Sequence, residues 1–135
     1  MITEENKAIV QQMYVAFGRG DVPAILETLA DDVEWHVMGS SEVVPWAGTR
    51  HGREQTSQFF RAVGETLDVE KFEARTMVAE GDTVVVVGWE RSRVKPTNRI
   101  YEDEWVHVFR VRQGKIAAFR EFNNSAAWLA AYRGA

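Results

Sequence analysis

Two ionisable side chains near the C-terminal end of the sequence, His107 and Glu121, have the chemistry of an acid/base pair. His107 directly precedes the stretch VFRVRQGKIAAFREF, residues 108–122, and Glu121 lies near its end. The pattern of this stretch is typical of two strands joined by a tight turn. A neutral imidazole can donate or accept a proton near neutral pH. A carboxyl group on an apolar face is costly to bury unless it is neutral or paired. We therefore predict that His107 and Glu121 are catalytic residues, provided that both point into one space.

Whether they meet depends on the turn between the two strands. A two-residue loop, Gln113-Gly114, would place His107 opposite Arg120 and needs positive φ at both loop residues, which Gln accommodates poorly. A three-residue loop over 112–114 needs positive φ only at its glycine. It places His107 and Glu121 on one face and Arg120 on the other. Both registers give amphipathic strands, and the turn chemistry favours the three-residue loop.

In that register the two faces of the strands differ in character. One face is charged, and the other is mainly apolar and aromatic, as expected of a sheet curved around a pocket. The apolar face carries Tyr101, Asp103, Trp105, His107, Phe109, Val111, Ala117, Phe119, Glu121 and Asn123. Trp105 and Phe119 are therefore predicted to contact a substrate. Asn123 either contacts the substrate or His107, or caps the NNSAAW turn together with Asn124.

The composition describes one globular domain, residues 1–135. Apolar residues make up 45% and charged residues 27% of the chain, and the five Trp could fill a core or line an apolar pocket. A net charge of −4 without a basic run argues against nucleic-acid binding. No apolar run is long enough for a membrane helix, and the N-terminus lacks a signal-peptide pattern. The absence of cysteine fits a cytoplasmic location.

The elements that must position these side chains are helices followed by strands. Thr3 and Asp21 are predicted helix caps, the second with Pro23 in its first turn. Helical periodicity covers residues 3–17, 22–29 and 53–67, with a short strand at 31–38 and a loop at 39–52. Strand patterns cover 69–81, 83–94, 100–111 and 115–122, and a last helical turn covers 125–132. This order predicts an α+β fold in which helices cover one face of an antiparallel sheet.

Three stretches carry a resemblance to a known superfamily. YVAFGRGDVPAILETLADDVEWH, VPWAGTRHGREQTSQFF and HVFRVRQGKIAAFREF resemble the nuclear-transport-factor-2-like superfamily, and more narrowly SnoaL-like and ketosteroid-isomerase-like proteins. The resemblance implies a cone-shaped, curved antiparallel sheet wrapped by three N-terminal helices around an apolar cavity. It also implies a homodimer formed through the outer sheet face. The superfamily includes isomerases, cyclases, hydrolases and non-catalytic binders, so the fold leaves the activity open.

The ketosteroid isomerase site is not present as a set. The position of the family's base, a few residues after Ala30-Asp31-Asp32, is Val37. The phenol donor of the first helix falls near Met13, with Tyr14 one residue away. The acid of the oxyanion hole falls at His107.

The limonene-epoxide-hydrolase-like site is also incomplete. Its last-strand carboxylate matches Glu121, and its other carboxylate falls near Glu90. Gly88 stands where that family has its bridging Arg. Trp35 and Val37 stand where it has the Tyr and Asn that position water.

These comparisons define the predicted pocket and its contents. The substrate-binding candidates are Tyr14, Trp35, Val37, Trp46, Glu90, Trp105, Phe119 and Asn123, with Trp46 at the mouth of the cone. His36 and His51 lack ligand spacing, so no metal is expected, and neither is a cofactor. The expected partner is a small apolar, oxygen-bearing molecule. The protein either converts it, as an isomerase, cyclase or hydrolase, or only binds it; a protein-interaction module is the third possibility.

Two structural roles compete with the catalytic one. His107 could be a core histidine hydrogen-bonded to a neighbour, and Glu121 could pair with Arg91. The outward side chains Val85, Val87, Trp89, Val106 and Val108 would form an apolar patch, which a second copy of the chain would cover.

Overall fold

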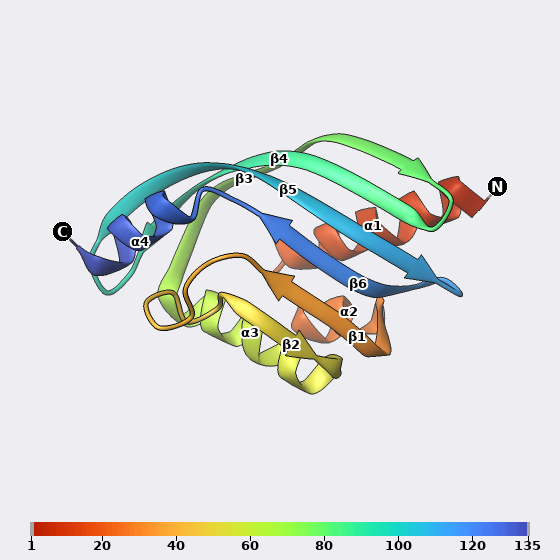
Figure 1. The fold of residues 1–135 in the computed structure, drawn as a ribbon, viewed down its shortest axis with the longest axis horizontal. Helices are drawn as coiled ribbons and strands as arrows, with labels where there is room; N and C mark the ends of the chain where they lie inside the picture. The colour runs from red at the N-terminus through yellow and green to blue at the C-terminus, as the bar shows by residue number, and fades with distance from the viewer. Residues whose placement is uncertain (1, 135) are drawn as a thin grey trace.

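The computed structural model describes residues 2–134, which form helices and one six-stranded sheet (Figure 1). The helices are α1 (Ile2–Gly18), α2 (Val22–Glu27), α3 (Gly52–Thr66) and α4 (Ser125–Arg133). The strands are β1 (Leu29–Val37), β2 (Gly48–His51), β3 (Leu67–Glu80), β4 (Thr83–Val94), β5 (Arg99–Arg112) and β6 (Lys115–Phe122). The predicted α+β class and the three N-terminal helices are confirmed.

The strands follow the order β2-β1-β6-β5-β4-β3 in a curved, unclosed sheet. Helices α1, α2 and α3 lie along its concave side, and α4 packs at the end of β5 (Figure 1). The sheet is not wholly antiparallel as expected, because β1 and β6 pair in parallel. These two strands are far apart in the sequence, so no hairpin turn imposes an antiparallel direction on them.

Local signals explain most element boundaries. The Asp21 carboxylate accepts a hydrogen bond from the Ala24 amide at 3.1 Å and caps α2 as predicted. The predicted cap at Thr3 is wrong, because α1 already begins at Ile2. The predicted loop 39–52 is also partly wrong. Its last residues form β2, where pairing with β1 satisfies the backbone groups of an exposed segment.

The turn between β5 and β6 differs from the predicted one. Gln113 and Gly114 have φ of 51° and 76°, so the loop is the two-residue form that was disfavoured for its glutamine. A bulge follows, since Arg110 pairs with Ala118 but Val111 pairs with Ile116. The extra residue in β6 restores the odd-with-odd pairing that the turn alone would have broken.

The prediction that His107 and Glu121 share one face is therefore confirmed, although the three-residue turn from which it was argued is wrong. His107 lies directly opposite Glu121, and Arg120 pairs with Val108 and points to the other side. The side chains of His107 and Glu121 therefore face each other directly across the strand pair.

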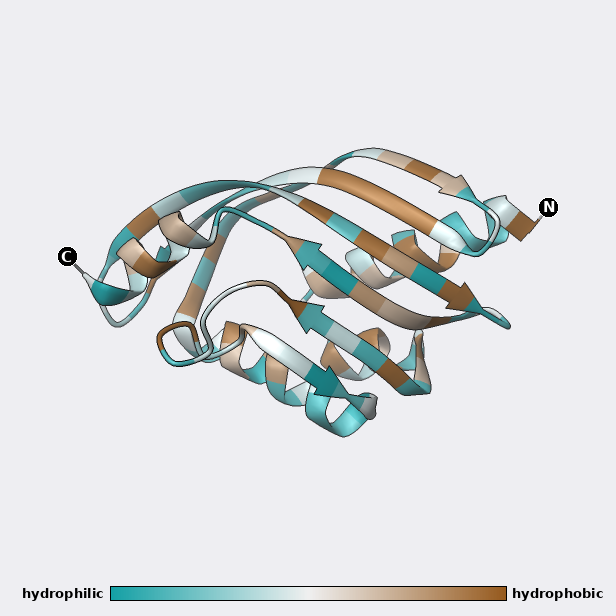
Figure 2. Ribbon diagram, viewed as in Figure 1, coloured by the Kyte–Doolittle hydropathy of each residue, from teal (hydrophilic) through white to brown (hydrophobic). Residues whose placement is uncertain are grey.

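The core fills the space between the sheet and the helices. Its largest fully buried side chains include Trp35, Trp105, Trp128 and Phe109. The valine run of β4 is apolar on both faces, which Figure 2 shows as a continuous hydrophobic stretch. Val84 and Val86 are buried in the core, whereas Val87 is 39% exposed on the outer face. The predicted apolar outer patch is present, and the dimer that it suggests stays a prediction.

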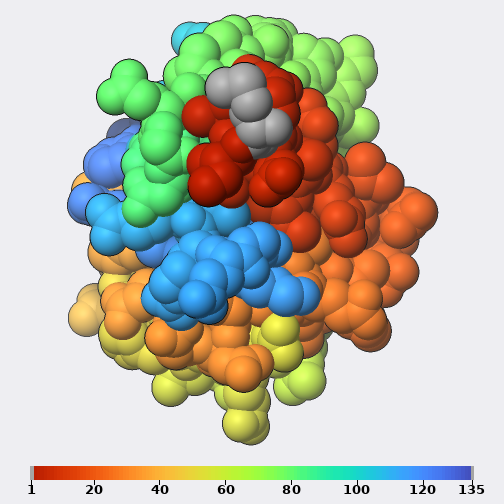
Figure 3. Space-filling model, turned by 90° about the vertical axis from the view of Figure 1, so that its right-hand side faces the viewer, coloured from red at the N-terminus to blue at the C-terminus, as the bar shows by residue number. Residues whose placement is uncertain are grey.

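The N-terminal end of α1 lies against two turns of the sheet. Figure 3 shows it between the β3–β4 turn and the β5–β6 turn, so that three segments distant in the sequence lie side by side. The Asn6 amide donates to the Gly81 carbonyl at 3.1 Å and fixes this arrangement. Helix α1 thereby packs against β3, β4 and β6. Within residues 2–134 no helix is long and apolar enough to cross a bilayer.

Candidate functional site

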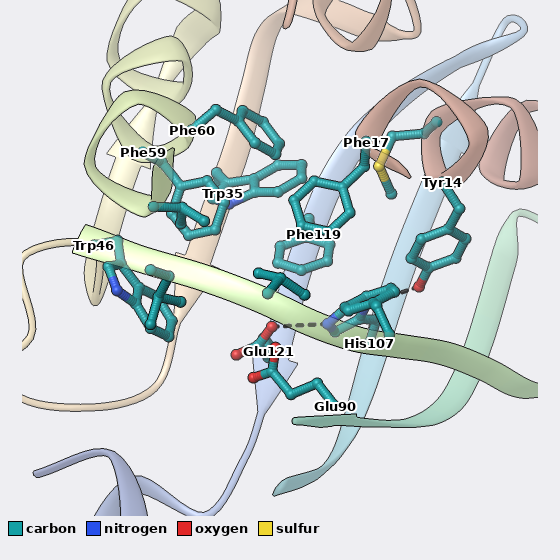
Figure 4. Close-up of a pocket in the computed structure, with 15 residues that line it drawn as sticks. Tyr14, Phe17, Trp35, Trp46, Phe59, Phe60, Glu90, His107, Phe119 and Glu121 are labelled. Atoms are coloured by element: carbon teal, nitrogen blue, oxygen red, sulfur yellow. Dashed lines mark hydrogen bonds and ion pairs between the residues drawn. The ribbon is translucent and has the colours of Figure 1, made fainter. Parts of the chain in front are cut away.

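An inner cavity of about 50 Å³ lies between the concave face of the sheet and helices α1 and α3. Its walls are apolar and aromatic except for Tyr14, Glu90, His107 and Glu121 (Figure 4). A water needs roughly 10–15 Å³ of such volume, so the cavity has room for only a few waters. The full lining is Met13, Tyr14, Phe17, Trp35, Trp46, Phe59, Phe60, Val63, Leu67, Val69, Phe72, Glu90, His107, Phe119 and Glu121.

A hydrogen-bonded chain of three ionisable side chains runs along one wall. The Tyr14 hydroxyl lies 2.7 Å from Nδ1 of His107, and Nε2 of His107 lies 2.7 Å from Oε1 of Glu121. The three residues come from α1, β5 and β6, and they converge in Figure 4. His107 and Glu121 are 4% and 9% exposed, so water does not compete for these bonds. The predicted pair is brought together, and Tyr14 extends it.

The chain can hold its protons in two arrangements. In one, Tyr14 donates to Nδ1, and Nε2–H donates to an ionised Glu121. In the other, a protonated Glu121 donates to Nε2, and Nδ1–H donates to the Tyr14 oxygen, which leaves the phenolic hydrogen free. The second arrangement holds one proton more than the first. Passing from the second to the first therefore releases one proton from the Tyr14 hydroxyl into the cavity, while Tyr14 is reprotonated by His107 and His107 by Glu121, without moving a heavy atom. The arrangement can therefore deliver or remove a proton at the cavity wall.

Burial sets the protonation of this chain. It raises the pKa of Glu121 to about 8, partly offset by the amide of Asn123, and lowers the pKa of His107 well below its usual value. Burial also raises the pKa of Tyr14, with a contribution from the charge of Glu121. Each shift has the same cause, because an apolar cavity disfavours the charged form of every group. Near neutral pH, Glu121 is largely protonated and His107 is neutral.

Asn123 orients Glu121 rather than capping a helix. Its amide nitrogen donates to Oε2 of Glu121 at 3.2 Å and to the Met38 carbonyl at 3.0 Å. The cap of α4 is Asn124, whose side chain accepts from the Ala127 amide at 3.3 Å. Neither of the roles predicted for Asn123 is the observed one, because it contacts Glu121 instead of His107 and leaves the cap to Asn124. Asn123 does not line the cavity, so it supports the site from behind.

Glu90 supplies a second carboxyl group to the cavity. It accepts hydrogen bonds from the Tyr101 hydroxyl at 3.2 Å and from the Ser92 hydroxyl at 3.3 Å. Burial, followed by the charges of Glu121 and Asp103, raises its pKa to about 8. The carboxyl groups of Glu90 and Glu121 point toward one another in Figure 4. Two carboxyl groups so placed resist being ionised together.

Trp105 lies behind the histidine instead of lining the cavity. Its ring stacks on His107 with centroids 3.9 Å apart, and on Phe72 with centroids 4.9 Å apart. It fits there because Gly88 on the neighbouring strand has no side chain. A Cβ at that position would meet Cζ2 of Trp105 at 2.2 Å. Gly88 stands where a related enzyme class has an arginine. Because it has no side chain, the indole of Trp105 occupies that space.

Trp35 and Phe119 form part of the cavity wall as predicted. Their rings stack with centroids 3.9 Å apart on the neighbouring strands β1 and β6. The buried indole nitrogen of Trp35 has no hydrogen-bond partner among residues 2–134. Val37, on the same strand, is fully buried but is not part of the lining. It therefore packs in the core and offers the ligand no polar group.

Trp46 lines the cavity but does not stand at an open mouth. It is 3% exposed, packs against Trp128 of α4, and donates a hydrogen bond to the Tyr132 hydroxyl. Helix α4 is itself tied to the sheet, because Asp103 accepts from the indole nitrogen of Trp128 at 3.0 Å. The expected mouth at Trp46 is therefore covered by the C-terminal helix, whose packing could not be read from the sequence.

Several lining residues were not predicted as ligand contacts. They are apolar side chains from α1, α3 and the first half of β3: Met13, Phe17, Phe59, Phe60, Val63, Leu67, Val69 and Phe72. The helical residues among them belong to apolar stripes that the periodicity does reveal. Periodicity identifies an inward face, but it does not distinguish side chains in a filled core from those around a cavity.

The remaining candidates lie elsewhere. His36 is hydrogen-bonded to Thr49, and His51 to Glu34 at 3.2 Å, away from the cavity. Arg91 pairs with Glu70 at 3.0 Å on the outer face and leaves Glu121 to the histidine. In the described part of the chain no group of three or more His, Cys, Asp or Glu side chains is placed to hold a metal ion.

Comparison with known proteins agrees with this architecture. Residues 10–119 match the model of the SnoaL-like domain. The chain is 36% identical to an NTF2-like protein from Burkholderia xenovorans LB400, with a TM-score of 0.88 over 96% of this chain and 97% of that one. An NTF2-like protein from Burkholderia thailandensis E264 is 31% identical, with a TM-score of 0.83 over 93% and 95%.

A more distant structure shares the fold alone. TerC, co-crystallised with polyporic acid, is 22% identical, with a TM-score of 0.85 over 96% of this chain and 98% of that one. The comparison with curated proteins gives no match. The family match over most of the chain and the two Burkholderia relatives agree with the curved sheet and its cavity. The chain therefore belongs to the SnoaL-like family of the NTF2-like superfamily.

Proposed function

We propose that this protein is a cofactor-independent acid–base catalyst that acts on a small, largely apolar molecule carrying a carbonyl oxygen. The observation that carries the proposal is the chain from Tyr14 through His107 to Glu121, with 2.7 Å at both links, in the wall of an apolar cavity. Such a chain holds a transferable proton away from water. The reaction class is proton transfer next to a carbonyl group, as in an isomerisation or a cyclisation.

Each group has a defined role in the proposed reaction. The Tyr14 hydroxyl gives its proton to the carbonyl oxygen and receives one from His107, which is reprotonated by Glu121. The ionised carboxylate of Glu90 removes a proton from the carbon next to the carbonyl, so that an enol forms. Reversal of both transfers, with the proton returned to the same or another carbon, completes an exchange or an isomerisation. The indole nitrogen of Trp35, which has no hydrogen-bond partner among the described residues, is a further donor for an oxygen of the ligand.

The raised pKa values suit this division of labour. With pKa values of about 8, Glu121 can act as the proton source, while a fraction of Glu90 is ionised and can act as the base. A base works best when its pKa lies near the working pH. The rate should therefore follow a bell-shaped pH profile with its maximum close to pH 8, because one carboxyl must be protonated and the other ionised.

The test is deuterium exchange at the carbon beside the carbonyl of a panel of small apolar ketones, followed by NMR in heavy water. We expect the protein to accelerate exchange, and His107→Ala to reduce the acceleration by roughly 10²–10⁴, the usual size of general acid–base catalysis. Ketone affinity should change much less. His36→Ala, which removes a histidine on the outer side of β1, is the matched control and should exchange like the wild type.

A non-catalytic binding protein is the second candidate. It is favoured by Val37, a fully buried apolar residue where ketosteroid isomerases carry their base. Such a protein would bind ketones but show no exchange at any pH from 5 to 9. His107→Ala would then only weaken binding, by about 1–3 kcal/mol if a polar group of the ligand is left unpaired. Binding without exchange would refute the catalytic proposal.

A further inference from the structure

A second hollow of about 530 Å³ lies directly beside the inner cavity. It is a groove between the C-terminal half of α1, helix α2, the end of α3 and the first half of β3. The two hollows share the side chains Tyr14, Phe17, Phe60, Val63, Leu67, Val69 and Phe72. The two hollows are therefore adjacent and are separated by a wall of side chains.

Aromatic rings form the centre of this wall. The ring of Phe17 lies 5.1 Å from that of Phe72 and 6.2 Å from that of Phe60, centroid to centroid. Phe17 and Phe72 are only partly buried, so each has solvent on one side and the cavity on the other. A change of side-chain rotamer at Phe17 or Phe72 needs no movement of the backbone. The wall can thus open between the groove and the acid groups.

The sizes of the two hollows constrain the ligand. The inner cavity of about 50 Å³ holds little more than the functional end of a molecule, whereas the groove has about ten times that volume. The groove is also lined without a single charged side chain; its additional residues are Val15, Gly18, Gly20, Val22, Ile25, Gly64 and Ala74. The ionisable side chains Glu90, His107 and Glu121 thus line only the inner cavity, and the side chains that line only the groove are apolar.

We propose that the groove binds the apolar chain of an elongated ligand whose carbonyl end lies in the inner cavity. This inference rests on the proposed function for the position of the carbonyl end, and it adds a substrate class: amphiphilic carbonyl compounds longer than the inner cavity. The orientation follows from desolvation, because Glu90, His107 and Glu121 line only the inner cavity, whereas the side chains that line only the groove are apolar. The rings of Phe17, Phe60 and Phe72 then surround the chain where it passes between the two hollows.

The probe is the series of straight-chain 2-alkanones from four to twelve carbons, with affinity measured by calorimetry. In the wild type, affinity should rise about fourfold for each CH₂ that enters the groove. Gly64→Leu should remove this increase for the long ketones and leave the affinity of the shortest unchanged. Gly64 lines only the groove, and a Cβ there meets no atom within 4 Å, so the leucine fills the groove without touching the inner cavity.

Two further variants make the result decisive. Glu65→Leu adds the same side chain to an exposed position of α3 outside the groove and should keep the wild-type increase. Gly18→Leu, also at a groove position with no atom within 4 Å of its Cβ, is the replacement should Gly64→Leu fail to fold. An affinity that is independent of chain length, or that rises equally in the groove variants, would overturn the inference.

The outcome is separate from that of the proposed function. A ketone affinity that rises with chain length, without deuterium exchange of any ketone, would support the groove and refute the catalytic role. Deuterium exchange of short ketones, with an affinity that does not depend on chain length, would support the catalytic role and refute the groove. Failure of every ketone to bind would overturn the groove proposal.

Discussion

Replacing Glu121 by glutamine should stabilise the protein at high pH and leave its stability unchanged at low pH. Burial raises the pKa of this carboxyl from 4.5 to about 8 in the folded protein. Below pH 4.5 both the folded and the unfolded chain hold the proton, so the group contributes nothing to the difference. Between the two pKa values the unfolded chain loses the proton and the folded one keeps it. The free energy of unfolding therefore falls as pH rises through this window.

The size of the effect follows from the same numbers. At 1.36 kcal/mol per pKa unit, a pKa raised from 4.5 to about 8 corresponds to a penalty of about 5 kcal/mol above pH 8 and about 3 kcal/mol at pH 7. Glutamine reproduces the protonated carboxyl: its amide can donate to Nε2 of His107 while its oxygen accepts from Asn123, as Glu121 does. The variant should thus have wild-type stability near pH 4.5 and gain up to about 5 kcal/mol at pH 9.

Urea unfolding followed by tryptophan fluorescence at pH 5, 7 and 9 measures this difference. The control is Glu104→Gln, an exposed side chain on the opposite face of β5, which should change stability by no more than about 0.5 kcal/mol at any pH. A Glu121→Gln variant that is no more stable than wild type at pH 9 would show that the carboxyl is not held protonated by burial. Glu121 could then not supply the proton that the proposed chain to His107 and Tyr14 needs.

Two further substitutions test the surroundings of the site and the outer face. Gly88→Ala should destabilise the fold by roughly 1–3 kcal/mol, the usual cost of overpacking, because its Cβ would lie 2.2 Å from Trp105 and push the indole off the histidine; unfolding curves identical to wild type would contradict this packing. Trp89→Glu should convert a homodimer into a monomer in sedimentation, because it places a charge in the apolar outer patch. A wild-type protein that already sediments as a monomer would refute that expectation.

The sequence by itself was sufficient for the fold class and for the residue types of the site. Periodicity, caps and turn residues place nearly every helix and strand, because each depends on local preferences that a single stretch of chain displays. The strands Thr83–Val94 and Lys115–Phe122 have the predicted bounds to the residue. The shared face of His107 and Glu121 was predicted correctly, but from a three-residue turn that the structure does not have, because alternation along β5 and β6 allows both registers.

The tertiary structure decided what these side chains meet. The bulge at Ala117 sets His107 opposite Glu121, and a bulge depends on how β6 fits between two neighbours rather than on its turn. Tyr14 reaches the histidine only because α1 packs on the concave face of the sheet. The covering of Trp46 by α4, the parallel pairing of β1 with β6, and the separation of the inner cavity from the groove are likewise contacts between segments distant in sequence. Local preference carries no information about such contacts, because they are fixed by the packing of the whole chain.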